Sequence, residues 1–153
     1  FAADCEAWFK DDVEGKATLT LQEAADTAAE AIVVGNEFGP GVPVDTGFAR
    51  SSFRVALNEA VDGPSQPPPT PGRKPGDAPI FTEPLDTSAI EQATLDTLVY
   101  VTTAAEYAVH LEELGNKRRF GPNAGGSTQF IAPVEQRWPS IVEDAARRVG
   151  YGA

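Results

Sequence analysis

Apolar residues near the start of the chain recur at the spacing of an α-helix. Across residues 3–34 they lie three or four positions apart, which places them on one face of an amphipathic helix. Gly35 and Asn36 supply a stop signal at the C-terminal end. The apolar face is rich in alanine, so the surface that packs on it must come close. Its members are Val13, Ala17, Leu21, Ala24, Ala28 and Ile32.

The length of this helix bears on assembly. A continuous helix over these residues would be about 45 Å long at 1.5 Å per residue. A compact domain of 153 residues has a radius of gyration of only about 15 Å. Gly15 is a candidate break, which would leave Trp8 and Phe9 on a shorter leading helix. An unbroken helix would project beyond its own domain and require a neighbour.

Two segments have the pattern of β-strands. Residues 52–61 alternate between apolar side chains and polar or small ones, as in a half-buried strand. Residues 98–103 are rich in β-branched and aromatic side chains. Residues 129–132 are a candidate for a further short strand.

Shorter helices are predicted around the strands. Asp45 or Thr46 is positioned to cap a helical turn over 48–51, and Asp86 and Ser88 can cap a helix over 88–97. Further helices are expected over 106–114 and from Pro133 to 149, the latter with a kink at Pro139 and an apolar face of Ile141, Ala145 and Val149. These elements predict an α+β fold. A small, mainly antiparallel sheet of three or four strands is packed by the long N-terminal helix and the C-terminal helix.

Residues 62–84 differ in kind from the rest of the chain. They hold eight of the thirteen prolines and three glycines. Proline lacks an amide donor and fixes φ, so this stretch is neither a helix nor a central strand. Because both flanks have the patterns of folded elements, we interpret it as a Pro-rich arm within one domain spanning 1–153. Loops of this length are usually functional or disordered.

Charge is unevenly distributed. The chain has 23 acidic residues against 12 lysines and arginines, a formal net charge of −11, and residues 1–48 hold ten of the acids and two of the lysines. This balance argues against a protein that grips DNA through its phosphates. The plain interpretation of the acidic N-terminal part is a solvated helix face. No apolar run is long enough to cross a membrane, and no signal peptide is visible.

Candidate chemistry is sparse. His110 is the one histidine, with Glu106 one turn before it and Glu113 three residues after it, which permits a hydrolase in principle. The simpler interpretation is a surface histidine with acidic neighbours. Cys5 is the one cysteine, so an intrachain disulfide is excluded. We predict no catalytic residues, cofactor or metal site, and no enzyme activity.

Three short stretches, taken in order, carry a resemblance. They are PVDTG at 43–47 with RSSF at 50–53; VYVTT at 99–103 followed by Tyr107, Ala108 and LEELG at 111–115; and FIAP at 130–133. In order and spacing they resemble the tail-completion, or head–tail joining, proteins in the neck of long-tailed bacteriophages and gene transfer agents. The positions that match the motifs are Asp45, Thr46, Gly47, Tyr107, Ala108, Glu113, Gly115, Phe130 and Pro133.

The resemblance implies a virion structural protein, made in the bacterial host cytoplasm and located in the neck. Copies would form a ring, most simply a hexamer, that joins the connector or head-completion protein to the tail terminator or tail tube protein. DNA would pass through the ring without specific binding. Candidate contacts between copies are Val13, Ala17, Leu21, Ala24 and Ala28 on the helix, and Pro67, Pro68, Pro69, Arg73 and Lys74 on the arm.

Two other functions fit the composition. An acidic module that mimics DNA, or another regulatory binding module, would be a monomer or dimer that binds a basic protein. A small hydrolase would depend on His110, so its turnover would be lost on His110→Ala.

Overall fold

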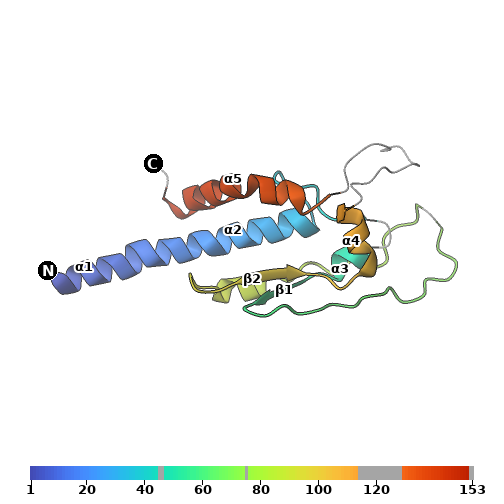
Figure 1. Cartoon of the computed structure of the whole chain (residues 1–153), viewed down its shortest axis with the longest axis horizontal. Helices are drawn as coiled ribbons and strands as arrows, with labels where there is room; N and C mark the ends of the chain where they lie inside the picture. Colours follow the sequence, from blue (N-terminus) through green and yellow to red (C-terminus); the bar gives the residue numbers. More distant parts are fainter. Residues whose placement is uncertain (45–46, 75, 114–128, 152–153) are drawn as a thin grey trace.

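The structure, a computed structural model, describes residues 1–44, 47–74, 76–113 and 129–151. Its elements confirm the predicted α+β fold, with a long N-terminal helix, a C-terminal helix and a small antiparallel sheet (Figure 1). In chain order they are α1 (Ala2–Trp8), the π-helix η1 (Phe9–Glu14), α2 (Gly15–Val33), α3 (Phe48–Ser51), β1 (Arg54–Leu57), the 3-10 helix η2 (Ser88–Gln92), β2 (Val99–Thr102), α4 (Glu106–Glu113) and α5 (Ala132–Val149).

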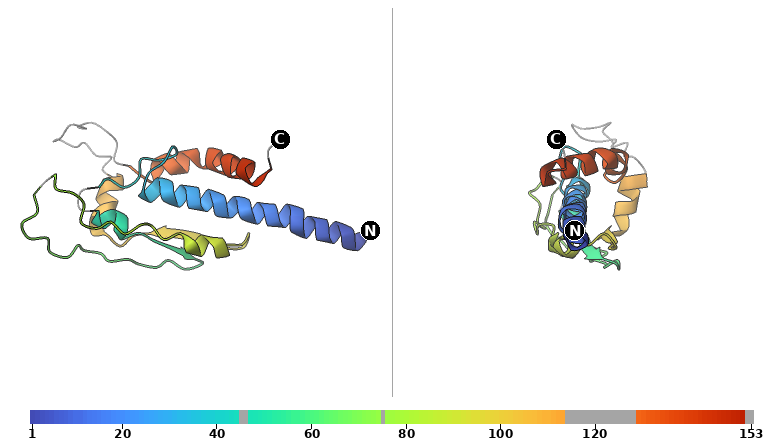
Figure 2. Two further views of the ribbon diagram at one scale, coloured as in Figure 1. Left: turned by 180° about the vertical axis from the view of Figure 1, so that it is seen from behind. Right: turned by 90° about the vertical axis from the view of Figure 1, so that its left-hand side faces the viewer.

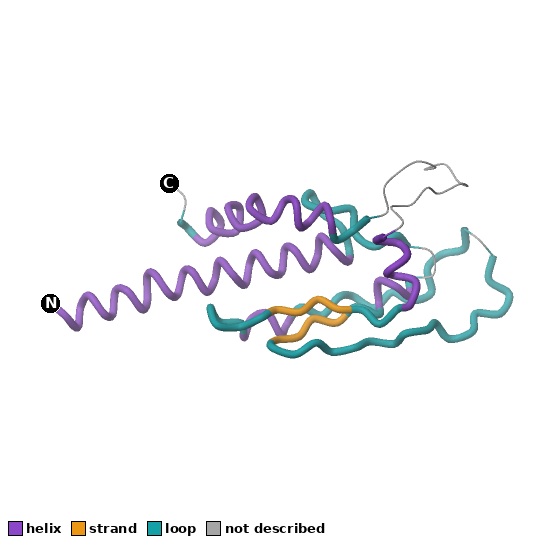
Figure 3. Tube along the Cα trace, viewed as in Figure 1, coloured by secondary structure: helices purple, strands orange, loops and turns teal. Residues whose placement is uncertain are grey.

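The N-terminal helix is continuous from α1 through η1 into α2 (Figure 3). The predicted break at Gly15 is wrong, because its φ of −60° and ψ of −49° are helical. The Gly15 amide donates to the carbonyl of Lys10, the five-residue spacing of a π-helix. The local irregularity is therefore a widened turn, and the helix continues to Val33. Gly35, just beyond its end, has a φ of 101° and stops the helix as predicted.

Helix α2 forms the middle layer of the fold. Figure 2 shows it end-on, with α5 on one side and the sheet on the other. One row of alanines packs on α5, and a second row packs on η2 and the sheet. Because the alanine side chain is a single methyl group, both layers can approach α2 closely. The first row is Ala24, Ala28 and Ala31, against Val134, Ile141 and Ala145, and the second is Ala25 and Ala29, against Ile90.

The sheet is smaller than predicted. Among the described residues β1 and β2 are the strands, and they pair antiparallel with Arg54 opposite Thr102 and Leu57 opposite Val99. The expectation of three or four strands is wrong. The candidate strand at 129–132 leads directly into α5, because its amides donate to a carboxylate of α4 and not to a neighbouring strand.

The helix predicted over 88–97 is shorter than expected and ends at Gln92. Thr94 and Thr97 form a turn instead, in which the Thr94 amide donates to the Thr97 hydroxyl at 2.9 Å. A threonine side chain that bonds the local backbone competes with helix in this way. At the other end the N-cap is Thr87, with no side-chain capping bond, so the predicted capping by Asp86 or Ser88 is wrong; Ser88 instead donates hydrogen bonds to the Asp86 carboxyl that lower its pKa.

The Pro-rich arm is an extended loop that leaves the sheet and returns to it (Figure 1). Its outgoing base is fixed by hydrogen bonds from the Thr102 hydroxyl to the Val61 carbonyl, at 2.7 Å, and from the Glu106 amide to the Ser65 carbonyl, at 3.3 Å. Its returning base is fixed by the Phe81 ring, which meets Phe48 edge-on at 5.6 Å between centroids.

Helix α5 begins at Ala132 with Pro133 in its first turn, as predicted, and contains Pro139 without ending there. Ile141 and Ala145 of its predicted apolar face are buried against α2. Within the described part of the chain, no helix is both long and apolar enough to cross a membrane.

Candidate assembly surfaces

Of the three predicted motif positions in PVDTG, Gly47 is described, whereas Asp45 and Thr46 lie outside the described residues, as does Gly115. Gly47 is the N-cap of α3, and its φ of 87° is a left-handed conformation that costs other L-residues energy. A Cβ here would overlap the carbonyl oxygen of Phe81 at the base of the arm. The glycine therefore allows the turn and the arm to meet.

Arg50 joins the same turn to the end of the long helix. Its guanidinium donates to the carbonyls of Val34, at 3.1 Å, and Val42, at 3.2 Å. Partial burial lowers the pKa of the Arg50 guanidinium from its usual value. The motif region is thus a structural junction that connects α2, α3 and the arm.

The Glu112 carboxylate closes the other junction, between α4 and α5. One oxygen accepts the amides of Phe130, at 2.7 Å, and Ile131, at 3.0 Å, and the other accepts the amide of Ala132 at 2.9 Å. These amides have no partner within the first turn of a helix, and a negative charge is favourable there. The sequence singled out its neighbour Glu113, so this capping residue was missed.

We expect Glu112→Gln to lower the free energy of unfolding by about 2 kcal/mol, because the side-chain amide that replaces one oxygen faces backbone donors. Urea denaturation measures this loss. Glu135→Gln is the matched control, since Glu135 is exposed in the first turn of the same helix and its charge alone is worth about 0.5 kcal/mol. Equal losses in both variants would contradict the capping role of Glu112.

The other motif residues pack between α4 and the core. Ala108 is buried, and the Tyr107 ring lies 6.4 Å from that of Phe48. Phe130 is 1% exposed and meets Phe53 edge-on at 6.1 Å. Ala108 and Phe130 therefore shape the interior of the protein, whereas Tyr107 is partly exposed at 36%.

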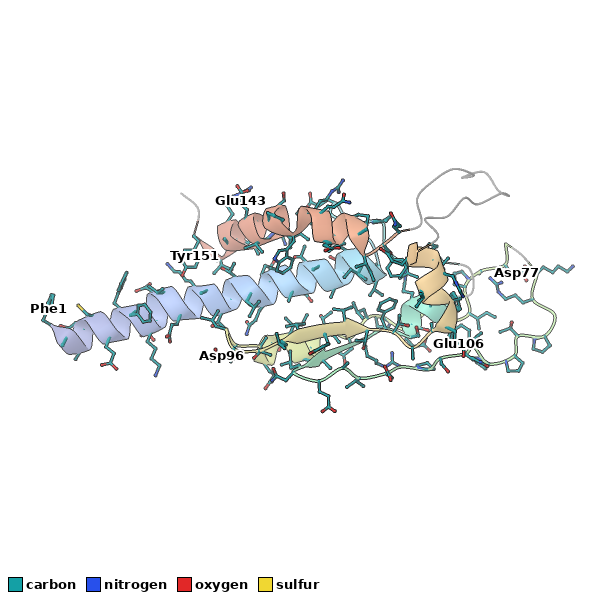
Figure 4. The ribbon with its side chains drawn as sticks, viewed as in Figure 1. Phe1, Asp77, Asp96, Glu106, Glu143 and Tyr151 are labelled. Atoms are coloured by element: carbon teal, nitrogen blue, oxygen red, sulfur yellow. The ribbon has the colours of Figure 1, made fainter. Side chains whose placement is uncertain are left out.

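The first exposed feature is the start of the long helix. No residue of α1 or η1 is buried, and Trp8 and Phe9 are 59% and 50% exposed. The Tyr151 hydroxyl donates to the Val13 carbonyl at 2.8 Å, next to the end of α5. Between Tyr151 and Phe1 the helix projects away from the other layers (Figure 4). We call residues 1–13 the overhang.

A second exposed feature is an apolar groove of about 570 Å³ between α2, the start of β2 and α5. Leu98 and Trp138 on its walls are 62% and 41% exposed. Glu135 is the one charged residue among those that line it. We call this feature the α2–α5 groove.

The predicted contact residues on the long helix have different environments. Ala24 and Ala28, predicted as contacts between copies, are buried against α5 of the same chain, and Ala28 also lines the α2–α5 groove. An alanine stripe needs a close partner, and α5 supplies it. Val13, Ala17 and Leu21 are half-buried, nearer the overhang.

On the arm, Pro67, Pro68, Pro69 and Lys74 are exposed. Arg73 is half-buried and donates to the carbonyl of Asp77 at 3.0 Å. The arm and the overhang lie at opposite ends of the molecule (Figure 1).

His110 is exposed on α4, one turn after the exposed Glu106, at the end of the molecule opposite Cys5 in α1 (Figure 1). Searching the described ranges finds no group of three or more histidine, cysteine, aspartate or glutamate residues arranged to hold a metal ion.

No family model, curated protein or solved structure matches this chain. The functional proposal therefore depends on the exposed surfaces and on the three short sequence motifs.

Proposed function

We propose that this protein is a virion structural protein of the head–tail interface. Copies assemble as a ring, most simply a hexamer, between the connector and the tail terminator or tail tube. The resemblance of the three motif stretches to neck proteins supports this, and so does the α+β fold in which those stretches form the junctions between helices and sheet.

The observation that carries the proposal is the overhang. It is a continuous helix with exposed Trp8 and Phe9, and none of its residues in α1 or η1 is buried by the described part of the chain. Two exposed aromatic side chains leave apolar area in water, and burying that area against another molecule is favourable. A surface that meets a different surface on the next copy generates a ring when the rotation closes.

We further propose that part of the acidic surface lines the channel of the ring. Asp4, Glu6, Asp11, Asp12 and Glu14 are all exposed. Negative charge repels phosphate and would let DNA pass without sticking.

Native mass spectrometry of the purified chain, combined with a density map of the assembled particle, tests the function. We expect a closed ring in one or both experiments, with this chain between portal and tail. A particle map that places the chain elsewhere would contradict the proposed function. A ring with a basic lumen would contradict the proposed acidic channel.

The exposed acids of the overhang also favour a second candidate, an acidic module that mimics DNA. This candidate requires a monomer or dimer that binds a basic protein, with binding weakened by salt. A ring in native mass spectrometry counts against it.

A further inference from the structure

We propose that the overhang of one copy docks in the α2–α5 groove of the next copy. This inference deepens the proposed function, on whose ring assembly it rests, by naming the two surfaces that make the contact. Each copy donates one helix and receives one, so the contact is heterologous.

The overhang is unable to fill the groove of its own chain. It is part of one continuous helix with α2, and the residues at the two joins, Trp8 and Gly15, are helical. Since α2 itself forms a wall of the groove, the segment that continues its axis leads away from that groove. An occupant must therefore come from another molecule.

The two surfaces match in length. Along α2 the groove extends from Leu21 to Ile32, a rise of eleven steps or about 16 Å. The uncovered helix extends from Ala2 to the point where Tyr151 meets Val13, again a rise of eleven steps and about 16 Å. The groove can thus take the whole overhang along its axis.

They also match in chemistry. The overhang presents Trp8 and Phe9, and the groove presents Leu98, Ile131 and Trp138, all of them exposed. A helix that inserts large apolar side chains into an apolar groove is a common mode of recognition. Buried aromatic residues of this kind carry most of the energy of protein interfaces.

Charge favours the groove over a second overhang as the partner. Residues 1–14 hold five acids and one lysine, Lys10, so two overhangs side by side would repel each other. The groove has Glu135 as the one charged residue in its lining. Asp4 and Asp12, four residues before and after Trp8, share its side of the helix, so the docked helix must hold these two carboxylates at the solvent edge of the groove.

Cysteine cross-linking tests the contact, because Cys5 is the one cysteine of the chain, is exposed and lies in the overhang. We would add one cysteine at either end of the groove, as Leu98→Cys or Ile131→Cys, and oxidise mildly. At least one of these variants should give a ladder of disulfide-linked oligomers beyond the dimer. Cys5→Ser should abolish the ladder. Glu143→Cys, on an exposed part of α5 (Figure 4), is the control and should give none.

A second measurement uses no cysteine. The double variant Trp8→Asp/Phe9→Asp should lower the oligomeric fraction at least tenfold in native mass spectrometry. At concentrations where both chains are monomeric, its unfolding midpoint in urea should equal that of the wild-type chain, because neither residue is buried. Lys10→Gln is the matched surface change in the same helix and should assemble as the wild type does.

Failure of this interface is distinguishable from failure of the proposed function. If the wild-type chain forms rings but neither groove cysteine cross-links and the double variant assembles, the interface is wrong and the ring stands. Disulfide dimers through Cys5 alone, with no ladder from the groove cysteines, would also overturn it. If the ladder forms and the chain is absent from the particle neck, the interface stands and the function is wrong.

Discussion

Replacing Gly47 with alanine should lower the free energy of unfolding by about 3 kcal/mol or more. A non-glycine residue at positive φ costs on the order of 1 kcal/mol. In addition, the new Cβ would overlap the Phe81 carbonyl, and backbone at the base of the arm must shift to relieve it. Urea denaturation with a constant m-value would measure the loss as a fall in midpoint.

Gly72→Ala is the matched control. Gly72 also has a positive φ, of 80°, but a Cβ there would meet nothing within 4 Å. We expect it to cost about 1 kcal/mol, the conformational part alone. If both variants lose the same amount, contact between the PVDTG turn and the returning arm does not contribute to stability.

Replacing Phe130 with alanine should cost about 4 kcal/mol, because the ring is fully buried and its removal leaves a cavity between α4, α5 and Phe53. For a chain of this size, such a loss lowers the melting temperature by about 8–16 °C. Differential scanning calorimetry would measure it.

The same change at Phe9 is the control, since that ring is half-exposed on the overhang. At concentrations where the chain is monomeric, Phe9→Ala should change stability by less than about 0.5 kcal/mol. A comparable loss at both positions would mean that the overhang packs on its own chain.

The hydrophobic pattern predicted the main helices because burial repeats with the helical period. The pattern did not predict the elements whose ends depend on hydrogen bonds. At Thr94 and Thr97 side-chain bonds to the backbone stop a helix that the pattern continued, and at Gly15 a widened turn preserves a helix that glycine was expected to break. The strand expected at 129–132 has the apolar content of a strand, but Glu112 binds its amides.

The same limit applies to the surfaces. Apolar residues spaced three or four apart indicate that Ala24 and Ala28 lie on a buried helix face. The spacing does not indicate whether the surface that buries them belongs to the same chain or to another. The partner is Ile141 and Ala145 of α5, more than one hundred residues away. Likewise, Glu112 and Glu113 are adjacent and identical in type, and only the position of α5 decides which one caps it.

The layer order has a consequence for how the chain folds. Helix α2 lies near the N-terminus, but the residues that cover its alanine face come from α5, and the Arg148–Glu23 ion pair between them bridges a separation of 125 residues. During synthesis the alanine face therefore stays uncovered until almost the whole chain has left the ribosome. Contacts of such high sequence separation slow folding. The α2–α5 groove forms only when α5 docks, so a nascent chain has no groove in which to accept a neighbour.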